Sequence, residues 1–389
     1  MADRKILVGV MKMDVAGEDA RSLSSLTAGA TARFERELLR ETRLRVDPLT
    51  FDGPNLTPAE GGYAALDFVQ IGINEKTERK LSFLLIITEV EINAASLSYL
   101  LALPSQLTNV SIISTRRLAE LGSREHDDIP LMTDRLATLM LHCFGRMLNL
   151  AHHPDRSNYM ATIVEPADLD PMTHFTEAQF GKMAEDLPAE ANDRFSDGNR
   201  TGFALSQTLA NLPRILRAAF RANPVKIASK LPTMIATALS VNVILVFGAE
   251  TWDFAASVST QQLAVFVVGT FVAATYVLYQ AFSFRLVSAR HGEISESAVV
   301  TAGATYLAVF LTLVVLFVLF GGIIYGLVAL VFPDALMSTW TTAEDGAQFG
   351  DHLRLSMFLA AVGVLSGSLG GSADSRSVVR NVLFAVDET

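Results

Sequence analysis

Four long apolar stretches dominate the second half of the chain and limit its fold more than any other feature. A helix needs about 20 apolar residues to cross a bilayer. Each stretch is near or above that length and contains no Asp, Glu, Lys, Arg or His. We therefore expect an all-α region of four transmembrane helices within residues 231–373, with the lipid bilayer as a partner. The stretches cover residues 231–249, 263–284, 299–332 and 355–371.

The third stretch is longer than a bilayer requires, so a single helix there would tilt or project beyond the lipid. The pair Gly321-Gly322 leaves a split into two helices open. Glycines four residues apart let helix backbones approach closely, which favours packing within one four-helix bundle, with self-association into a homo-oligomer as the alternative. Ion and proton paths usually need ionisable groups, so these spans disfavour a channel or pump. The spaced glycines are Gly322 and Gly326 on the third stretch, and Gly363, Gly367 and Gly371 on the fourth.

Positive charges in the second half fall almost entirely on one side of a four-span arrangement. The positive-inside rule makes that side cytoplasmic. Both termini, including the tail at residues 374–389, are thus predicted to lie inside at the cell (inner) membrane, with residues 250–259 and 333–351 outside. Arg354, at the edge of the second outer loop, is the exception. The bases on the predicted inner side are Arg214, Arg217, Arg221, Lys226, Lys230, Arg285, Arg290, Arg376 and Arg380.

A linker at residues 186–230 precedes the first span. Its first part, residues 188–200, is polar and rich in turn-forming residues, which is typical of a domain boundary. Residues 203–222 then place apolar side chains at helical spacing, with Arg214 and Arg217 on a flanking face. This pattern predicts a juxtamembrane amphipathic helix. It would lie either on the anionic inner leaflet or beneath the soluble domain, and both positions remain open.

The first 185 residues read as a soluble α+β domain, a mixed sheet with helices. Runs rich in branched residues predict strands at 6–11, 44–51, 83–89 and 110–114. Helical periodicity predicts helices at 18–42, 63–80 and 133–151. The last should begin at Thr133 and Asp134, whose oxygens can accept from the first free amides. The chain is acidic, with a net charge of −10, which disfavours a nucleic acid partner.

Residues 141–160, LHCFGRMLNLAHHPDRSNYM, keep the spacing of the zinc-protease motif H-E-x-x-H-x-x-G-x-x-H. His142 and His152 occupy the first and third ligand places. Cys143 stands at the place of the general base, Arg146 at the second ligand place and Asn149 at the glycine. Asn is the second-best residue after Gly for a left-handed turn. The backbone path can therefore survive while the zinc chemistry is lost.

The region resembles the archaemetzincins, whose motif continues past the third His as Cys, four residues, Cys, one residue, Met. His153 and Asn158 stand at the two cysteine places and Met160 at the Met-turn place. The family's later C-x-x-C pair has no counterpart, because Cys143 is the only cysteine. The likeness covers roughly residues 5–160. It implies a metzincin-like fold in which residues 109–115 form the edge strand that pairs with an extended peptide.

The replaced residues argue against catalysis. Arginine presents only donors and stays charged, so Arg146 cannot ligate zinc. Cys143 is adjacent to His142 on a helix, and their side chains point about 100° apart. No catalytic residue, metal or cofactor is expected. The chain is predicted to be a pseudoprotease that binds or regulates a peptide or protein partner at the cytoplasmic membrane face. The alternative is a membrane-bound zinc metallopeptidase whose rearranged site uses the residual ligands His142, His152 and His153.

Overall fold

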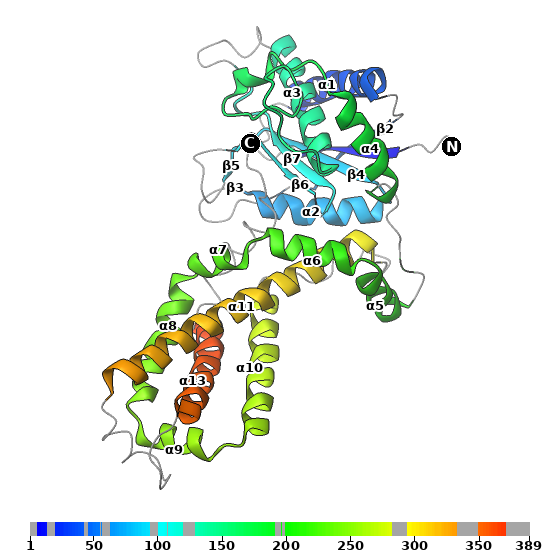
Figure 1. Ribbon diagram of the computed structural model, residues 1–389. Coiled ribbons are helices and arrows are strands. Elements are labelled where there is room, and N and C mark those ends of the chain that lie inside the picture. The colour runs from blue at the N-terminus through cyan, green and yellow to red at the C-terminus, as the bar shows by residue number, and fades with distance from the viewer. Residues whose placement is uncertain are drawn as a thin grey trace. The chain divides into compact units, whose positions relative to one another are not determined.

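The computed structural model divides into two compact units, each of which is described by itself (Figure 1). Unit 1 comprises Met1–Asn211, Leu286–Thr301 and Leu383–Thr389, and unit 2 comprises Leu212–Arg285 and Ala302–Val382. The structure describes residues 6–13, 20–42, 46–54, 56, 63–93, 100–106, 108–119, 129–190, 196, 199–281, 294–332 and 349–370.

A five-stranded mixed sheet forms the centre of unit 1, in the order β2-β1-β4-β7-β6. All of its neighbouring pairs are parallel except β6 and β7, which are antiparallel. Two further short strands, β3 (Tyr63–Ala64) and β5 (Ile92–Asn93), pair with each other. The strands of the main sheet are β1 (Ile6–Met13), β2 (Val46–Asp52), β4 (Phe83–Thr88), β6 (Ala102–Ser105) and β7 (Val110–Ser114).

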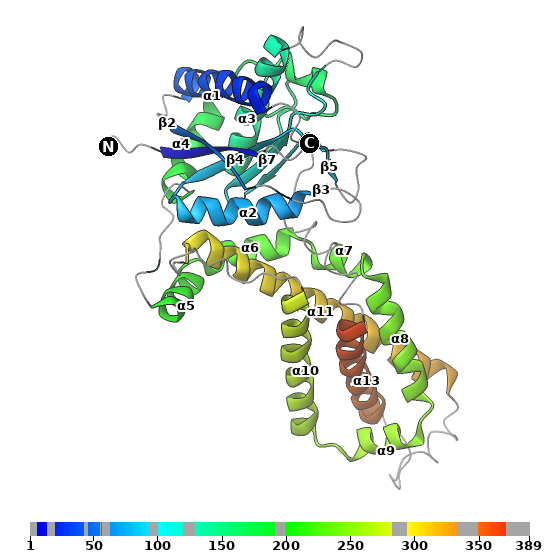
Figure 2. The same cartoon turned by 180° about the vertical axis from the view of Figure 1, so that it is seen from behind.

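Helices cover both faces of this sheet (Figures 1 and 2). Helices α1 (Ala20–Thr42) and α3 (Ile129–Met147) pack together on one face, and α2 (Ala65–Glu78) lies on the other. The core between α1, α3 and the sheet is apolar and fully closed. Phe144 of α3 packs edge-on against Phe34 and Phe83, with ring centroids 5.7 and 5.1 Å away. The other helices that the structure describes wholly within this unit are η1 (Pro166–Leu169), α4 (Glu177–Glu190) and α5 (Arg200–Ala210).

The predicted α+β class is confirmed, but the predicted edge strand is wrong. Strand β7, predicted at residues 110–114, lies inside the described sheet between β4 and β6. All five of its side chains are buried, which is the pattern of a strand covered on both faces. The edge of the described sheet is instead β6, whose sequence ALPS is short and contains Pro104. Proline is tolerated at sheet edges because it has no N–H to donate.

The predicted start of α3 is also wrong. The helix begins at Ile129, with Pro130 in its first turn, rather than at Thr133. The Thr133 hydroxyl donates to the Ile129 carbonyl one turn back, at 2.7 Å. Asp134 pairs with Arg33 of α1. The side-chain oxygens of Thr133 and Asp134 therefore do not cap the helix. The first bonds within α3 and the second bonds to α1.

Unit 2 is helical, and only part of the predicted span pattern is found. Among the described residues, three helices are long and apolar enough to cross a membrane, and a bent helix pair could supply a fourth crossing. The long third stretch is one helix of 36 residues that runs through Gly321-Gly322, so it forms the single span and not the alternative split. The helices are α6 (Leu212–Arg221), α7 (Pro224–Ser229), α8 (Pro232–Val246), α9 (Ala249–Ser257), α10 (Thr260–Ala281), α11 (Glu296–Val331, whose first turns belong to unit 1) and α13 (Phe349–Gly370).

The first predicted span, residues 231–249, is not a single helix. Helix α8 has 15 residues, which is about 22 Å at 1.5 Å per residue and shorter than a hydrocarbon core of about 30 Å. The chain then bends by 89° into α9, which fills most of the predicted outer loop at residues 250–259. The indole of Trp252 donates to the Val246 carbonyl at 2.8 Å. This bond satisfies an acceptor that the end of α8 would otherwise leave without a partner.

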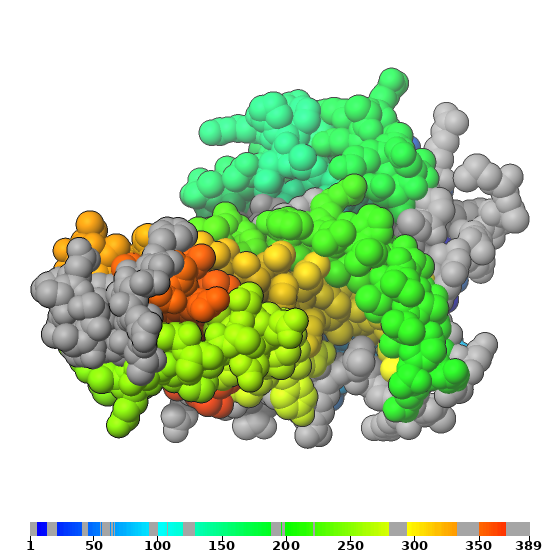
Figure 3. All heavy atoms as spheres, turned by 60° about the horizontal axis from the view of Figure 1, so that its bottom comes forward, coloured from blue at the N-terminus to red at the C-terminus, as the bar shows by residue number. Residues whose placement is uncertain are grey.

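Helix α13 lies between α8 and α10 (Figures 1 and 2), and its surface adjoins that of α9 (Figure 3). Gly363 and Gly367 face α8. A Cβ on Gly363 would lie 2.5 Å from Asn242 Nδ2, and one on Gly367 would lie 2.8 Å from the Met234 carbonyl. Close helix approach thus depends on both glycines. Gly322 and Gly326 meet nothing within 4 Å among the described residues, and Gly371 lies outside those residues.

The predicted amphipathic segment at residues 203–222 forms two helices rather than one. Helix α5 ends at Ala210 and α6 begins at Leu212. Between them, the Asn211 side chain donates to Glu296 Oε1 at 2.7 Å. Pro213 falls in the first turn of α6, where its missing N–H costs no hydrogen bond.

Candidate functional site

The C-terminal end of α3 and the loop after it bring the motif residues together. His142 and Arg146 are four residues apart and therefore share one side of the helix. The chain turns at Asn149, which has φ of 62°, a left-handed conformation at the place of the family's glycine. The loop then brings His152 beside His142, with ring centroids 5.9 Å apart. The structure therefore gathers the three residues that the motif spacing placed at ligand positions.

His142 is fully buried and held in one orientation. Its Nδ1 lies 2.7 Å from the Tyr159 carbonyl oxygen. Because a carbonyl can only accept, Nδ1 carries the hydrogen and Nε2 presents a lone pair. Nε2 is buried and has no hydrogen-bond partner in the part of the chain that the structure describes. Burial, together with the nearby Arg146 and His152, lowers the pKa of His142 to about 3, so the ring is neutral at pH 7.

Arg146 supplies the permanent charge of this site. Its Nη1 donates to the Leu150 carbonyl at 2.6 Å, which fixes the guanidinium over the turn. The pKa of His152 is lowered by partial burial and by the charge of Arg146. Both histidines therefore experience the guanidinium, and neither gains a proton easily beside it.

His153 belongs to the loop rather than to this group. Its Nδ1 accepts from the Asp155 amide at 3.2 Å, and its own amide donates to the Met160 carbonyl at 2.8 Å. Among the described residues, no group of three or more His, Cys, Asp or Glu side chains is suited to hold a metal ion. The structure thus brings His142, His152 and Arg146 together and leaves His153 in other contacts.

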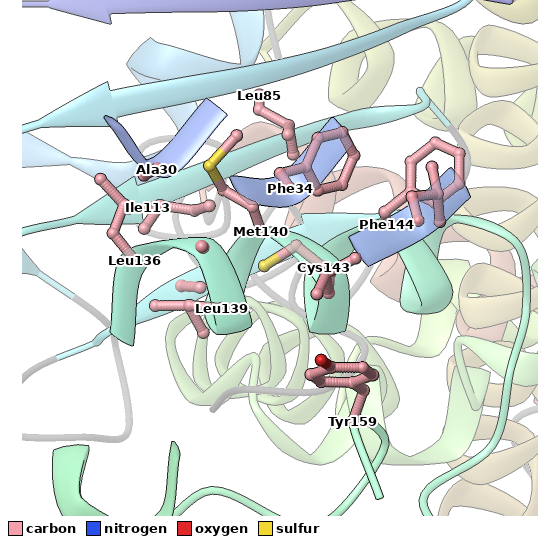
Figure 4. Close-up of a cluster of buried hydrophobic side chains, with 14 of the residues drawn as sticks. Ala30, Phe34, Leu85, Ile113, Leu136, Leu139, Met140, Cys143, Phe144 and Tyr159 are labelled. Atoms are coloured by element: carbon pink, nitrogen blue, oxygen red, sulfur yellow. The ribbon is translucent and has the colours of Figure 1, made fainter. Parts of the chain in front are cut away.

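Cys143, at the place of the general base, points into the hydrophobic core (Figure 4). The side chain is fully buried. It lies in the cluster that includes Phe34, Met140 and Phe144. Burial raises the pKa of its thiol to about 12. Cys143 therefore behaves as a small apolar side chain and can serve as neither a base nor a thiolate ligand at neutral pH.

The loop beneath the site is held by direct contacts. Met160, at the Met-turn place, is fully buried under Gly145, where an added Cβ would lie 2.5 Å from its sulfur. Asn158, at a family cysteine place, exchanges two hydrogen bonds with the Gln179 amide at 2.9 and 3.1 Å. Lys182 donates to the Asn149 carbonyl. The motif frame could not reveal Gln179 or Lys182, because both lie on α4, beyond the matched spacing.

The residues present do not fit a catalytic zinc ion. Three protein ligands around one open position are required. His142 has the form of a ligand, since its Nδ1–H is bonded to a carbonyl and its Nε2 is available. Arg146 at the second place offers only N–H donors and a positive charge. The donor set is therefore one ligand short.

Comparisons with known proteins found similar solved structures but no matching family model or curated protein. Solved structures similar to it include archaemetzincin from Methanopyrus kandleri, with 18% identity and a TM-score of 0.38, covering 47% of this chain and 96% of that one. A zinc-dependent peptidase from Methanocorpusculum labreanum shows 15% identity and a TM-score of 0.34, covering 48% and 100%. Archaemetzincin from Archaeoglobus fulgidus, complexed with malonate, shows 15% identity and a TM-score of 0.31, covering 46% and 99%. Each likeness covers slightly less than half of this chain and nearly the whole of the solved structure.

Proposed function

We propose that the chain is a membrane-anchored, catalytically inactive archaemetzincin-like protein that binds a partner at the cytoplasmic membrane face instead of cleaving it. Arg146 carries this proposal, because a guanidinium stands where a zinc ligand is needed. The burial of Cys143 supports it, since no side chain at that place can take a proton from water. General-base help is typically worth about 10²–10⁴ in rate.

The partner in this proposal is an extended peptide or protein segment. Edge strands bind such segments by main-chain hydrogen bonds. In the described sheet the edge is β6, which runs antiparallel to β7 from Ala102 to Ser105. Pro104 has no N–H, so added pairing would use the main chain of the residues around it. In this proposal β6, whose four residues are buried in the free chain, replaces residues 109–115 as the strand that pairs with the partner.

Helix α6 supports placement at an anionic membrane surface. Ile215 and Ala219 are buried, and Ile215 packs beside Gly303 of α11. Leu212, Leu216 and Phe220 are exposed at a spacing of four residues and so form one apolar row. The exposed Arg214 and Arg217 lie beside this row. A short helix with an apolar row and flanking arginines is suited to the boundary between acyl chains and anionic headgroups.

The topology can be tested with reporters fused after Thr389. Four crossings place both termini in the cytoplasm, so a reporter that works only there should be active. The test separates two topologies, because a re-entrant α8–α9 pair would leave three crossings and put the two termini on opposite sides of the membrane. A C-terminal reporter active only on the outer side would contradict the four-crossing proposal. A second reporter at the N-terminus serves as the reference.

Catalytic inactivity can be tested on the purified full chain in detergent. We expect no hydrolysis of a denatured protein or a mixed peptide library, and no stoichiometric zinc. Hydrolysis that a chelator abolishes and that His142→Ala removes would contradict the proposal. That result would establish the metallopeptidase alternative on His142, His152 and His153. His352→Ala on α13 is the matched control, because it removes a histidine from unit 2.

A further inference from the structure

We propose that the altered zinc place is a carboxylate-binding site, in which Arg146 holds the carboxylate and His142 accepts a hydrogen bond from a donor beside it. The inference rests on the proposed binding function and names the chemical group that is bound. Two sources share this chemistry. One is the C-terminal carboxylate of a peptide, with its own amide N–H near by, and the other is an acidic side chain within a peptide.

The first support is the position of a permanent cation. Arg146 is on the same side of α3 as His142, and its guanidinium is fixed by the Leu150 carbonyl. A planar guanidinium matches the two oxygens of a carboxylate better than any other side chain does. The place that lacks the means to hold a metal is therefore still electropositive.

The second support is the unmatched acceptor of His142. The ring is fully buried, its Nδ1–H is used by Tyr159, and Nε2 has no partner among the described residues. Buried polar atoms are normally satisfied by protein, water or ligand. Because Nδ1 already donates its hydrogen to the Tyr159 carbonyl, Nε2 is left as the acceptor of the ring. A complementary ligand must therefore present a donor as well as an anion, which a peptide C-terminus does.

The third support is the nearness of the surface. His152 is exposed, and its ring lies 5.9 Å from that of the buried His142. The buried acceptor therefore lies beside a surface residue. The loop around it is held in place, since Asn158 is paired with Gln179 and Met160 is packed under Gly145. A preformed site of this kind loses little conformational freedom when a ligand binds.

The test uses the full chain in detergent micelles with isotope-labelled histidine side chains, observed by NMR. Acetate is titrated at constant ionic strength with chloride, and acetamide, which has the same shape without the charge, is titrated in parallel. Acetate should shift the His142 and His152 ring signals in a saturable way, and acetamide should not. Arg146→Gln should weaken the acetate effect at least tenfold. Arg156→Gln is the matched control, because it removes an exposed arginine of the same loop.

Peptide probes then separate the two sources. N-acetyl-trialanine with a free carboxylate, its C-terminal amide, and amidated N-acetyl-Ala-Asp-Ala are titrated in the same way. Preference for the first assigns the site to peptide C-termini, and preference for the third assigns it to acidic side chains. Arg146→Lys keeps the charge but loses the planar fork. It should weaken binding several-fold, and it provides a measurement if Arg146→Gln fails to fold.

Equal shifts with acetate and acetamide would overturn the inference. Acetate binding that is unchanged in both Arg146 variants would overturn it as well. Binding of the amidated trialanine peptide as tight as that of the free acid would contradict the carboxylate site while leaving the proposed peptide-binding function intact. Peptide hydrolysis or stoichiometric zinc in the wild-type chain would instead defeat the proposed function itself.

Discussion

Two sides of helix α3 meet different surroundings and carry different kinds of side chain. The side toward the sheet carries Met140, Cys143 and Phe144, which are fully buried in one apolar core. The side toward the loop at residues 149–161 carries His142 and Arg146, where the ligand chemistry is incomplete. The core side is a cluster of buried apolar side chains, whereas an arginine stands at the second ligand place on the loop side. The comparison shows that α3 is held on one side by apolar packing and on the other by hydrogen bonds to the loop.

Direct contacts attach the loop after α3 to the helix. His142 and Arg146 each bond a carbonyl of the following loop, those of Tyr159 and Leu150. Farther along, Arg135 of α3 is almost fully buried and makes two hydrogen bonds of 2.7 Å to Asp170. A bidentate arginine–carboxylate pair of this kind fixes both distance and orientation. The loop is therefore attached to the helix at several points.

The largest effect that would sharpen this comparison is expected from Cys143→Glu. A carboxylate placed in the core next to Phe144 would be buried without a partner, at a cost of about 3–5 kcal/mol. Cys143→Ala leaves only a small cavity and should cost about 1 kcal/mol. Hydrogen exchange of the α3 amides in the full chain measures both changes locally. If the two variants exchange at the same rate, residue 143 faces the cleft and the assignment of the two sides of α3 is wrong.

The next largest effect is the pH dependence of the free energy of unfolding that His142, on the loop side of α3, produces. His142 has a pKa of 6.5 in an unfolded chain and about 3 in the fold. Between pH 6.5 and about 3, the His142 ring is protonated in the unfolded chain but stays neutral in the folded chain. The stability due to the neutral ring is thus complete above pH 6.5 and is lost as the pH falls toward 3, by up to about 1.4 kcal/mol per pH unit.

Hydrogen exchange of α3 between pH 7 and 4 tests this expectation, after correction for the intrinsic exchange rate. His142→Asn keeps a donor near Tyr159 but removes the titrating group, so its stability should change less with pH than that of the wild type. His352→Gln serves as the control and should retain the wild-type slope. An identical slope in the wild type and His142→Asn would show that the ring is not buried as described.

A smaller effect is expected at the turn between the two parts of the site. Asn149 has φ of 62°, and a left-handed conformation costs an ordinary L-residue roughly 1–2 kcal/mol. Asn149→Ala should therefore destabilise the turn by about 1 kcal/mol, while Asn149→Gly should not. The Lys182 contact is to a main-chain carbonyl and remains in both variants. Equal exchange rates for the two variants at residues 148–152 would argue against a turn held in this conformation.

The sequence predicted features that depend on local patterns. Strands β1, β2, β4 and β7 and the course of α1 and α2 follow from runs of branched residues and from helical periodicity. The places of His142, Arg146 and Asn149 follow from motif spacing. Strand β6 was missed because ALPS has no strand pattern, and it is a strand only through its pairing with β7. The start of α3 was missed because Thr133 and Asp134 bond within and between helices instead of capping.

Long-range contacts account for the other differences. The bend after α8 is accompanied by the bond from Trp252 to the Val246 carbonyl, which composition does not reveal. The glycine rows looked equivalent in the sequence. In the structure, Gly363 and Gly367 pack against α8, whereas Gly322 and Gly326 meet nothing within 4 Å among the described residues. Partners on distant elements decided each of these cases.

Metal content tests the central claim most directly, namely that Arg146 alone keeps a ligand-competent frame from holding zinc. The full-length wild type and Arg146→His are purified side by side, incubated with zinc, dialysed and analysed for bound metal. The variant places a third imidazole on the side of α3 that carries His142, near His152, and should bind about one zinc ion per chain. The wild type should bind none in stoichiometric amount. One zinc ion per wild-type chain, lost on His142→Ala, would contradict the account.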